Sequence, residues 1–84
     1  MYKNLIKSYA MKMTNEDVIE YGKKEGVNVT VEEASLFVDT VKANVDYILD
    51  GHAQEVLKSI KGKVSIEAYE KLEELLNKYQ KYID

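Results

Sequence analysis

Residues 14–17, Thr-Asn-Glu-Asp, and residues 26–33, Gly-Val-Asn-Val-Thr-Val-Glu-Glu, decide the fold. Each stretch holds a threonine followed three positions later by an acidic residue, Asp17 or Glu33, which is the pattern of a capping box at a helix start. Gly26 lies between them and predicts a helix end, because glycine readily adopts the left-handed conformation found there. Residues 14–44 are therefore predicted to form a helix, a tight extended loop and a second helix.

Outward from this unit, apolar residues at helical spacing predict three more helices. The first is basic, and its apolar stripe is predicted to consist of Tyr2, Leu5, Ile6, Tyr9 and Met13. The last begins after Ser65, a good capping residue. The chain is predicted to be an all-α, compact bundle of about five helices in a single domain, 1–84, with helices at about 2–12, 15–25, 31–44, 51–61 and 66–83.

Details within this frame can also be predicted. The helix 31–44 should bury a stripe of Ala34, Phe37, Val38, Val41 and Val45. Gly22 costs about 1 kcal/mol in a helix relative to alanine, so we expect it to allow another helix to approach closely. Residues 46–51 are interpreted as a connector whose apolar side chains cover the core, and Asp50 as the N-cap of the helix that follows.

Composition excludes several classes of protein. The 84 residues contain no Cys, so a disulfide framework and a thiolate metal site are excluded. No stretch resembles a signal peptide, and no run approaches the roughly 20 apolar residues of a membrane span. We therefore expect a cytoplasmic, soluble protein that is not associated with membranes.

Charge is distributed unevenly along the chain. Residues 1–13 carry three lysines and no acid, whereas residues 14–50 carry nine acids and three lysines. The basic first helix could pair with the acidic middle segment within one chain or between chains. The chain has no Arg, the residue best suited to bidentate recognition of phosphates and bases, so nucleic-acid binding is the less favoured alternative. Its candidate lysines are at positions 3, 7, 12, 58, 61 and 63.

No residue pattern indicates catalysis or a bound cofactor. His52 is the only histidine and lies beside Asp50 and Glu55 at a predicted helix start, where an exposed histidine is the simpler interpretation. The acids at 16, 17, 20, 32 and 33 suit the first turns of helices, and those at 67, 70, 73 and 74 a solvated helix face. We predict no catalytic residue, no metal ligand, no cofactor and no enzymatic activity.

Aromatic usage gives the best functional indication. The chain has seven Tyr, one Phe and no Trp, and tyrosine is favoured where one end of a ring is buried and the other is wet, as at interfaces. Packing in a small domain is the alternative explanation. We predict a small protein-interaction or regulatory module that binds either another protein or a second copy of itself as a homo-oligomer. The candidate interaction surface is Tyr2, Lys3, Lys7, Tyr9, Tyr69, Leu75, Tyr79 and Tyr82.

Two resemblances bear on this hypothesis. Residues 14–44, with Gly26 to Thr30 as the loop, resemble the helix–extended loop–helix motif of the SAP and LEM type, which implies a nucleic-acid or protein docking unit. The helix after that loop begins with Glu32 and Glu33, however, and a phosphate backbone would be repelled there.

The longer resemblance covers most of the chain. The residues that carry it are Thr14, Tyr21-Gly22-Lys23, Gly26, Thr30 with Glu33-Ala34, and the segment Val56-Leu57-Lys58-Ser59-Ile60. On these residues the chain is similar to the YqfT-like family of small uncharacterised proteins from spore-forming bacteria. This resemblance implies the helical fold and brings no activity or catalytic residue with it.

Overall fold

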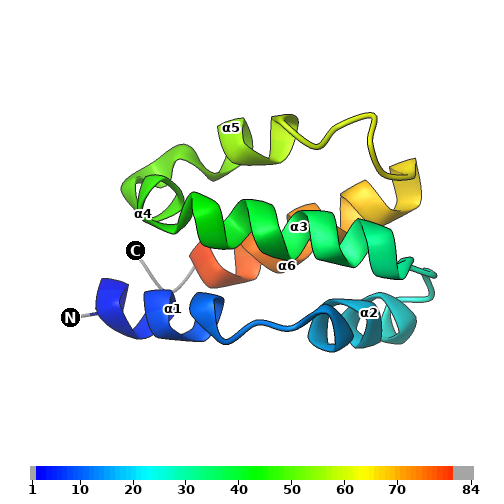
Figure 1. Cartoon of the computed structure of the whole chain (residues 1–84), viewed down its shortest axis with the longest axis horizontal. Coiled ribbons are helices and arrows are strands. Elements are labelled where there is room, and N and C mark those ends of the chain that lie inside the picture. Colours follow the sequence, from blue (N-terminus) through cyan, green and yellow to red (C-terminus); the bar gives the residue numbers. More distant parts are fainter. Residues whose placement is uncertain (1, 81–84) are drawn as a thin grey trace.

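The central helix of the protein is α3 (Val31–Ala43), and the other helices pack around it (Figure 1). A computed structural model describes the backbone of residues 2–80 and the side chains of residues 4–78. In Figure 1, α1 (Tyr2–Met11) and α2 (Asn15–Lys24) run along one side of α3, and α5 (Ala53–Lys58) lies along the other. Helix α6 (Ile66–Gln80) lies behind α3 and contacts α2. The described residues form helices, turns and loops without a strand, so the predicted all-α bundle is confirmed.

Both predicted capping boxes are present. The hydroxyl of Thr14 accepts a hydrogen bond from the N–H of Asp17 (3.2 Å), and the Thr14 N–H donates to the Asp17 carboxylate (3.1 Å). Thr30 and Glu33 make the same reciprocal pair, at 3.1 and 3.0 Å. Each box satisfies backbone donors that a helix N-terminus leaves unpaired, which fixes the starts of α2 and α3.

The loop between α2 and α3 begins with a Schellman motif. Gly26 has φ of 80°, its N–H donates to the carbonyl of Lys23 (3.1 Å), and the N–H of Val27 donates to the carbonyl of Gly22 (2.8 Å). This confirms Gly26 as the helix stop. The prediction that another helix approaches Gly22 is wrong, because the close approach there is made by this returning loop. A Cβ at Gly22 would lie 2.7 Å from Cγ2 of Val29 and 2.9 Å from the carbonyl oxygen of Val27.

The core lies beneath α3 and is shared by every helix. The predicted stripe of α3 is confirmed, since its four side chains and that of Val45 are buried. Helices α5 and α6 contribute Ala53, Val56, Leu57, Ala68, Leu72 and Leu76 to the same cluster. The N–H of Ala68 donates to the Ser65 hydroxyl (3.1 Å), which confirms Ser65 as the cap of α6. The predicted end of this helix, residues 81–83, lies outside the described residues.

The predicted connector at 46–51 is wrong for most of its length, because the chain stays helical up to a kink at Gly51. Helix α4 (Val45–Tyr47) and a π-helical turn, η1 (Ile48–His52), follow α3 after a short break. Ile48 and Leu49 are buried, as expected of core-covering residues, whereas Tyr47 is 45% exposed. Helical geometry lets both buried side chains reach the core while the backbone satisfies its own hydrogen bonds.

Gly51 explains why α5 begins later than predicted. Its φ of 97° interrupts the helical path, so α5 starts at Ala53 and its N-cap is His52 in place of Asp50. The helix also ends at Lys58 and not near residue 61, because residues 59–61 continue as tight turns in which each N–H bonds to the carbonyl three positions earlier.

Candidate interaction surface

Helix α1 has a buried side and an exposed apolar side. Ile6 and Ala10 are each 5% exposed and pack into the core, whereas Leu5 and Tyr9 are 53% and 57% exposed. The predicted stripe is thus confirmed for Ile6 and Met13, which are buried, and wrong for Leu5 and Tyr9, which flank the buried side. The two residues are one helical turn apart, so their side chains are neighbours on the outer surface.

The basic character of α1 is used partly within the chain. The ammonium of Lys7 lies 3.0 Å from the carboxylate of Asp46 in α4, and α1 packs against both α3 and α4. Lys7 keeps 45% of its side chain exposed and Asp46 keeps 77%. The basic helix thus pairs with the acidic middle of its own chain at this point.

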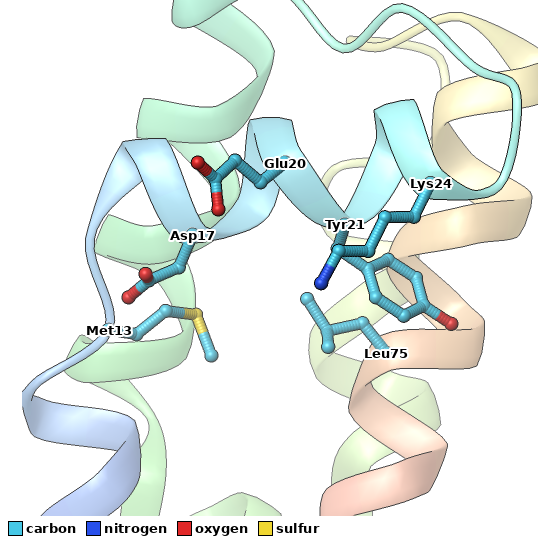
Figure 2. A pocket seen from close by; sticks show the side chains of 6 residues that line it. All are labelled: Met13, Asp17, Glu20, Tyr21, Lys24 and Leu75. Atoms are coloured by element: carbon cyan, nitrogen blue, oxygen red, sulfur yellow. The ribbon is translucent and has the colours of Figure 1, made fainter.

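A shallow groove of about 240 Å³ lies between α2 and α6. Figure 2 shows Met13 and Asp17 on one side of its opening and Tyr21 and Leu75 on the other. Glu20 and Lys24, which also line it, add one charge of each sign. The groove thus combines apolar side chains with charged ones at its opening.

Charged side chains tie α2 to α6 next to this groove. The ammonium of Lys71 lies 2.9 Å from the Glu74 carboxylate and 3.8 Å from that of Glu25 at the end of α2. The hydrogen bond from Lys71 to Glu74 raises the Lys71 pKa. Lys78 lies over the ring of Tyr21, with its nitrogen 4.6 Å from the ring centre. Such a cation–π contact holds Tyr21 at the edge of the groove.

A second hollow, of about 550 Å³, lies between α5 and α6. Its apolar lining is Val64, Ile66 and Tyr69, and Ile66 is 76% exposed. Partial burial, together with the charge of Glu73, raises the pKa of Tyr69. The hollow is wider than the groove and more apolar, and it lies on a different part of the surface.

His52 belongs to a small exposed cluster. Its ring stacks on that of Tyr47 with centres 4.3 Å apart, and its Nδ1 lies 3.4 Å from the Glu55 carboxylate. The Tyr47 hydroxyl donates a hydrogen bond to Glu55, which raises the Tyr47 pKa and lowers that of Glu55. The three side chains lie on open surface, which agrees with the interpretation of His52 as an exposed helix-start residue.

Two further classes of site are absent from residues 2–80. No group of three His, Cys, Asp or Glu residues in this part of the chain is placed to hold a metal ion. None of its helices has the length and apolar character needed to cross a membrane.

The members of the predicted interaction surface whose side chains the structure describes lie on different parts of the protein. Tyr9 and Lys7 lie on α1, Leu75 lines the groove between α2 and α6, and Tyr69 lines the hollow between α5 and α6. Tyr2, Lys3 and Tyr79 lie on helices α1 and α6, but their side chains are outside the described part, and Tyr82 is outside the described residues altogether.

Sequence reasoning did not find several residues of these surfaces. Met13 is buried, as its place in the predicted stripe implies, and it also lines the groove. The position of Tyr21 in the groove and the exposure of Ile66 were not predicted. The residues that these side chains meet are distant in sequence. The periodicity of apolar residues within one helix does not predict contacts with residues of another.

Comparison with known proteins identifies the family. The sequence matches the family described as "Protein of unknown function (DUF2624)" over residues 1–80. The chain belongs to this family, which agrees with the expectation of an uncharacterised domain. No curated protein and no solved structure matches the chain.

Proposed function

We propose that this domain is a small cytoplasmic protein-interaction or regulatory module that binds another protein or a second copy of itself. The observation that supports this most is the pair Leu5 and Tyr9, two neighbouring side chains on α1 that are each more than half exposed. Contiguous exposed apolar side chains on a folded domain mark sites of association, because water contact with them is unfavourable.

The groove between α2 and α6 supports the same proposal. Met13, one of the three residues between α1 and α2, lines this groove, so the groove and the exposed side of α1 lie within reach of one partner. Tyr21 and Leu75 add contact area at its edge, and tyrosine is favoured in interfaces because its ring packs while its hydroxyl stays hydrated.

No catalytic activity is included in this proposal. His52 lies with Tyr47 and Glu55 on open surface, and its side chain is 44% exposed. Acid–base or nucleophilic chemistry requires groups that converge on a reacting atom in a site that excludes water.

Nucleic-acid binding is the alternative function. Lys58, Lys61 and Lys63 are all exposed in and after α5, and this concentration of charge favours it. The SAP- and LEM-type resemblance of residues 14–44 points the same way. Against it stand the exposed Glu32 at the start of α3 and the acids of α6 beside Lys58 and Lys61. The resemblance to the YqfT-like family adds no partner to either function.

A capture experiment with matched variants tests the proposal. The full chain is immobilised and exposed to native cell extract, half of it treated with nuclease, and retained molecules are quantified by mass spectrometry. The variant Leu5→Glu/Tyr9→Glu puts charge on the exposed apolar side of α1. Its control, Asn4→Glu/Ser8→Glu, has the same charge change and spacing at exposed polar positions of the same helix. Circular dichroism confirms that both variants are folded.

We expect a protein that the wild type and the control retain and the Leu5/Tyr9 variant does not, with or without nuclease. Equal retention by all three chains would contradict the role of α1. Retention that disappears with nuclease would replace the proposal with the nucleic-acid alternative. Light scattering of the purified chain shows whether the partner is a second copy.

A further inference from the structure

The hollow between α5 and α6 has two walls of opposite charge. Lys58 and Lys61 come from α5 and the turn after it, and Glu70 and Glu73 come from α6. None of these four residues has an ion-pair partner within 4 Å among the side chains of residues 4–78. The two walls therefore carry charges that the described part of the chain leaves available to a partner.

The hollow also has an apolar part of its lining, which is open to water. It is made by Val64, Ile66 and Tyr69. Ile66 has the largest exposed fraction among the large apolar side chains of the described residues, 76%. A single exposed isoleucine needs no explanation, but here it continues into two other apolar side chains inside a hollow, which favours association.

We propose that a second copy of this chain docks in this hollow, related to the first by a two-fold axis. The inference rests on the proposed interaction function and names its partner and surface. A two-fold axis that runs along the hollow, parallel to its two walls, brings the surface against itself with each wall facing the opposite wall of the other copy. The lysine wall of each copy then meets the glutamate wall of its partner, and the exposed Ile66 side chains pack near the axis.

Charge complementarity with itself is what selects a second copy as the occupant. A uniformly basic peptide would be attracted by Glu70 and Glu73 and repelled by Lys58 and Lys61, and an acidic one would meet the reverse. The hollow offers only three apolar side chains, Val64, Ile66 and Tyr69, where obligate dimers bury extended apolar surfaces, so the association is of the weak, reversible class. Since its charges lie at the surface, salt weakens it.

Charge exchange tests this arrangement directly. The variants Lys58→Glu/Lys61→Glu and Glu70→Lys/Glu73→Lys each give both walls the same sign. Sedimentation equilibrium of the full chain should show association of the wild type, and an association constant about tenfold or more lower for each variant alone, since like charges face each other twice. An equimolar mixture of the two variants should recover association, because every facing pair is again opposite in sign.

A second pair of variants separates this from attraction by net charge. Lys12→Glu/Lys23→Glu and Glu32→Lys/Asp39→Lys make the same changes of net charge at exposed positions outside the hollow. Each control variant should have the association constant of the wild type, and mixing the two should not raise it. The two-fold docking would be overturned if each control variant associated as weakly as the charge-exchange variants and mixing the two controls restored association to the same extent.

Two other outcomes would overturn the inference without touching the proposed function. A chain that stays monomeric at millimolar concentration and low salt has no such dimer, yet it could still bind a different protein. Association lost in the Leu5→Glu/Tyr9→Glu variant but kept in both charge-exchange variants would place the contact on α1. Circular dichroism spectra shared by all variants exclude unfolding as the cause.

Discussion

The carboxylate of Glu33 accepts a hydrogen bond from the backbone N–H of Ser65, 32 positions later in the chain, at 2.7 Å. Its other oxygen accepts the N–H of Thr30 in the capping box of α3 (3.0 Å). One side chain thus caps α3 and also holds the residue that caps α6. The starts of the two helices are fixed relative to each other by this single carboxylate.

Glu33→Gln is expected to lower the free energy of unfolding by about 1–2 kcal/mol, because hydrogen bonds to a charged acceptor contribute more than neutral ones. The amide also places an N–H donor against one of the two backbone donors. Urea denaturation followed by circular dichroism measures the change. The control is Glu32→Gln, an exposed first-turn acid on the same helix, which should cost a few tenths of a kcal/mol through the helix dipole. Equal effects of the two variants would contradict the double role of Glu33.

The stabilisation by Glu33 should depend on pH. Partial burial raises its pKa, but the hydrogen bonds from Thr30 and Ser65 outweigh this, so the pKa in the folded chain lies below the usual value. A depressed folded-state pKa means that the contribution is complete above the unfolded-state pKa, roughly 4.3, and is lost as the pH falls through the folded-state value.

Comparison of wild type and Glu33→Gln isolates this effect. The difference in unfolding free energy between them should be full at pH 7 and should shrink when the pH falls below about 4. The wild type alone is not sufficient, because the pKa of Glu55 is lowered as well, by its hydrogen bond from Tyr47. A difference that stays constant from pH 7 to pH 3 would show that the charge of Glu33 contributes nothing.

The starts of α2 and α3 were predictable from the sequence because their chemistry is local. Thr14 with Asp17, and Thr30 with Glu33, lie three positions apart, so the capping geometry follows from the residue types alone. The bond from Glu33 to Ser65 could not be predicted in this way, since it depends on how α3 and α6 pack. The same limit applied to the groove, which joins Met13 and Leu75 from distant segments.

The pattern of apolar residues was least informative where more than one local structure could bury the same side chains. Ile48 and Leu49 were correctly expected to cover the core, but a connector and a π-helical turn both satisfy that expectation. On α1, Leu5 and Tyr9 fit the helical stripe as well as Ile6 does. The packing of α1 against α3 and α4 decides which side of α1 is buried. It therefore also decides whether Tyr9, a residue of the predicted interaction surface, is exposed.

Gly22→Ala is expected to destabilise the domain, although alanine is the better helix former by about 1 kcal/mol. The new Cβ would lie 2.9 Å from the Val27 carbonyl oxygen, and this backbone atom is held by its place in the Schellman loop. Overpacking of this kind typically costs about 1–3 kcal/mol. Thermal unfolding should show a lower midpoint than for Lys23→Ala, an exposed control in the same helix. An increase in the midpoint would mean that the loop moves away freely.

The ion pair between Lys7 and Asp46 is expected to contribute less than about 0.5 kcal/mol to stability, because both side chains are well exposed and solvent screens their attraction. A double-mutant cycle with Lys7→Ala and Asp46→Ala, measured by urea denaturation at low salt, gives the coupling energy of the pair. A coupling above about 1 kcal/mol would mean that the pair fixes α1 against α4. A weak coupling has a functional consequence: Lys7 can then exchange Asp46 for an acidic group of a partner at little cost to the fold, so the basic side of α1 remains available for binding beside the exposed Leu5 and Tyr9.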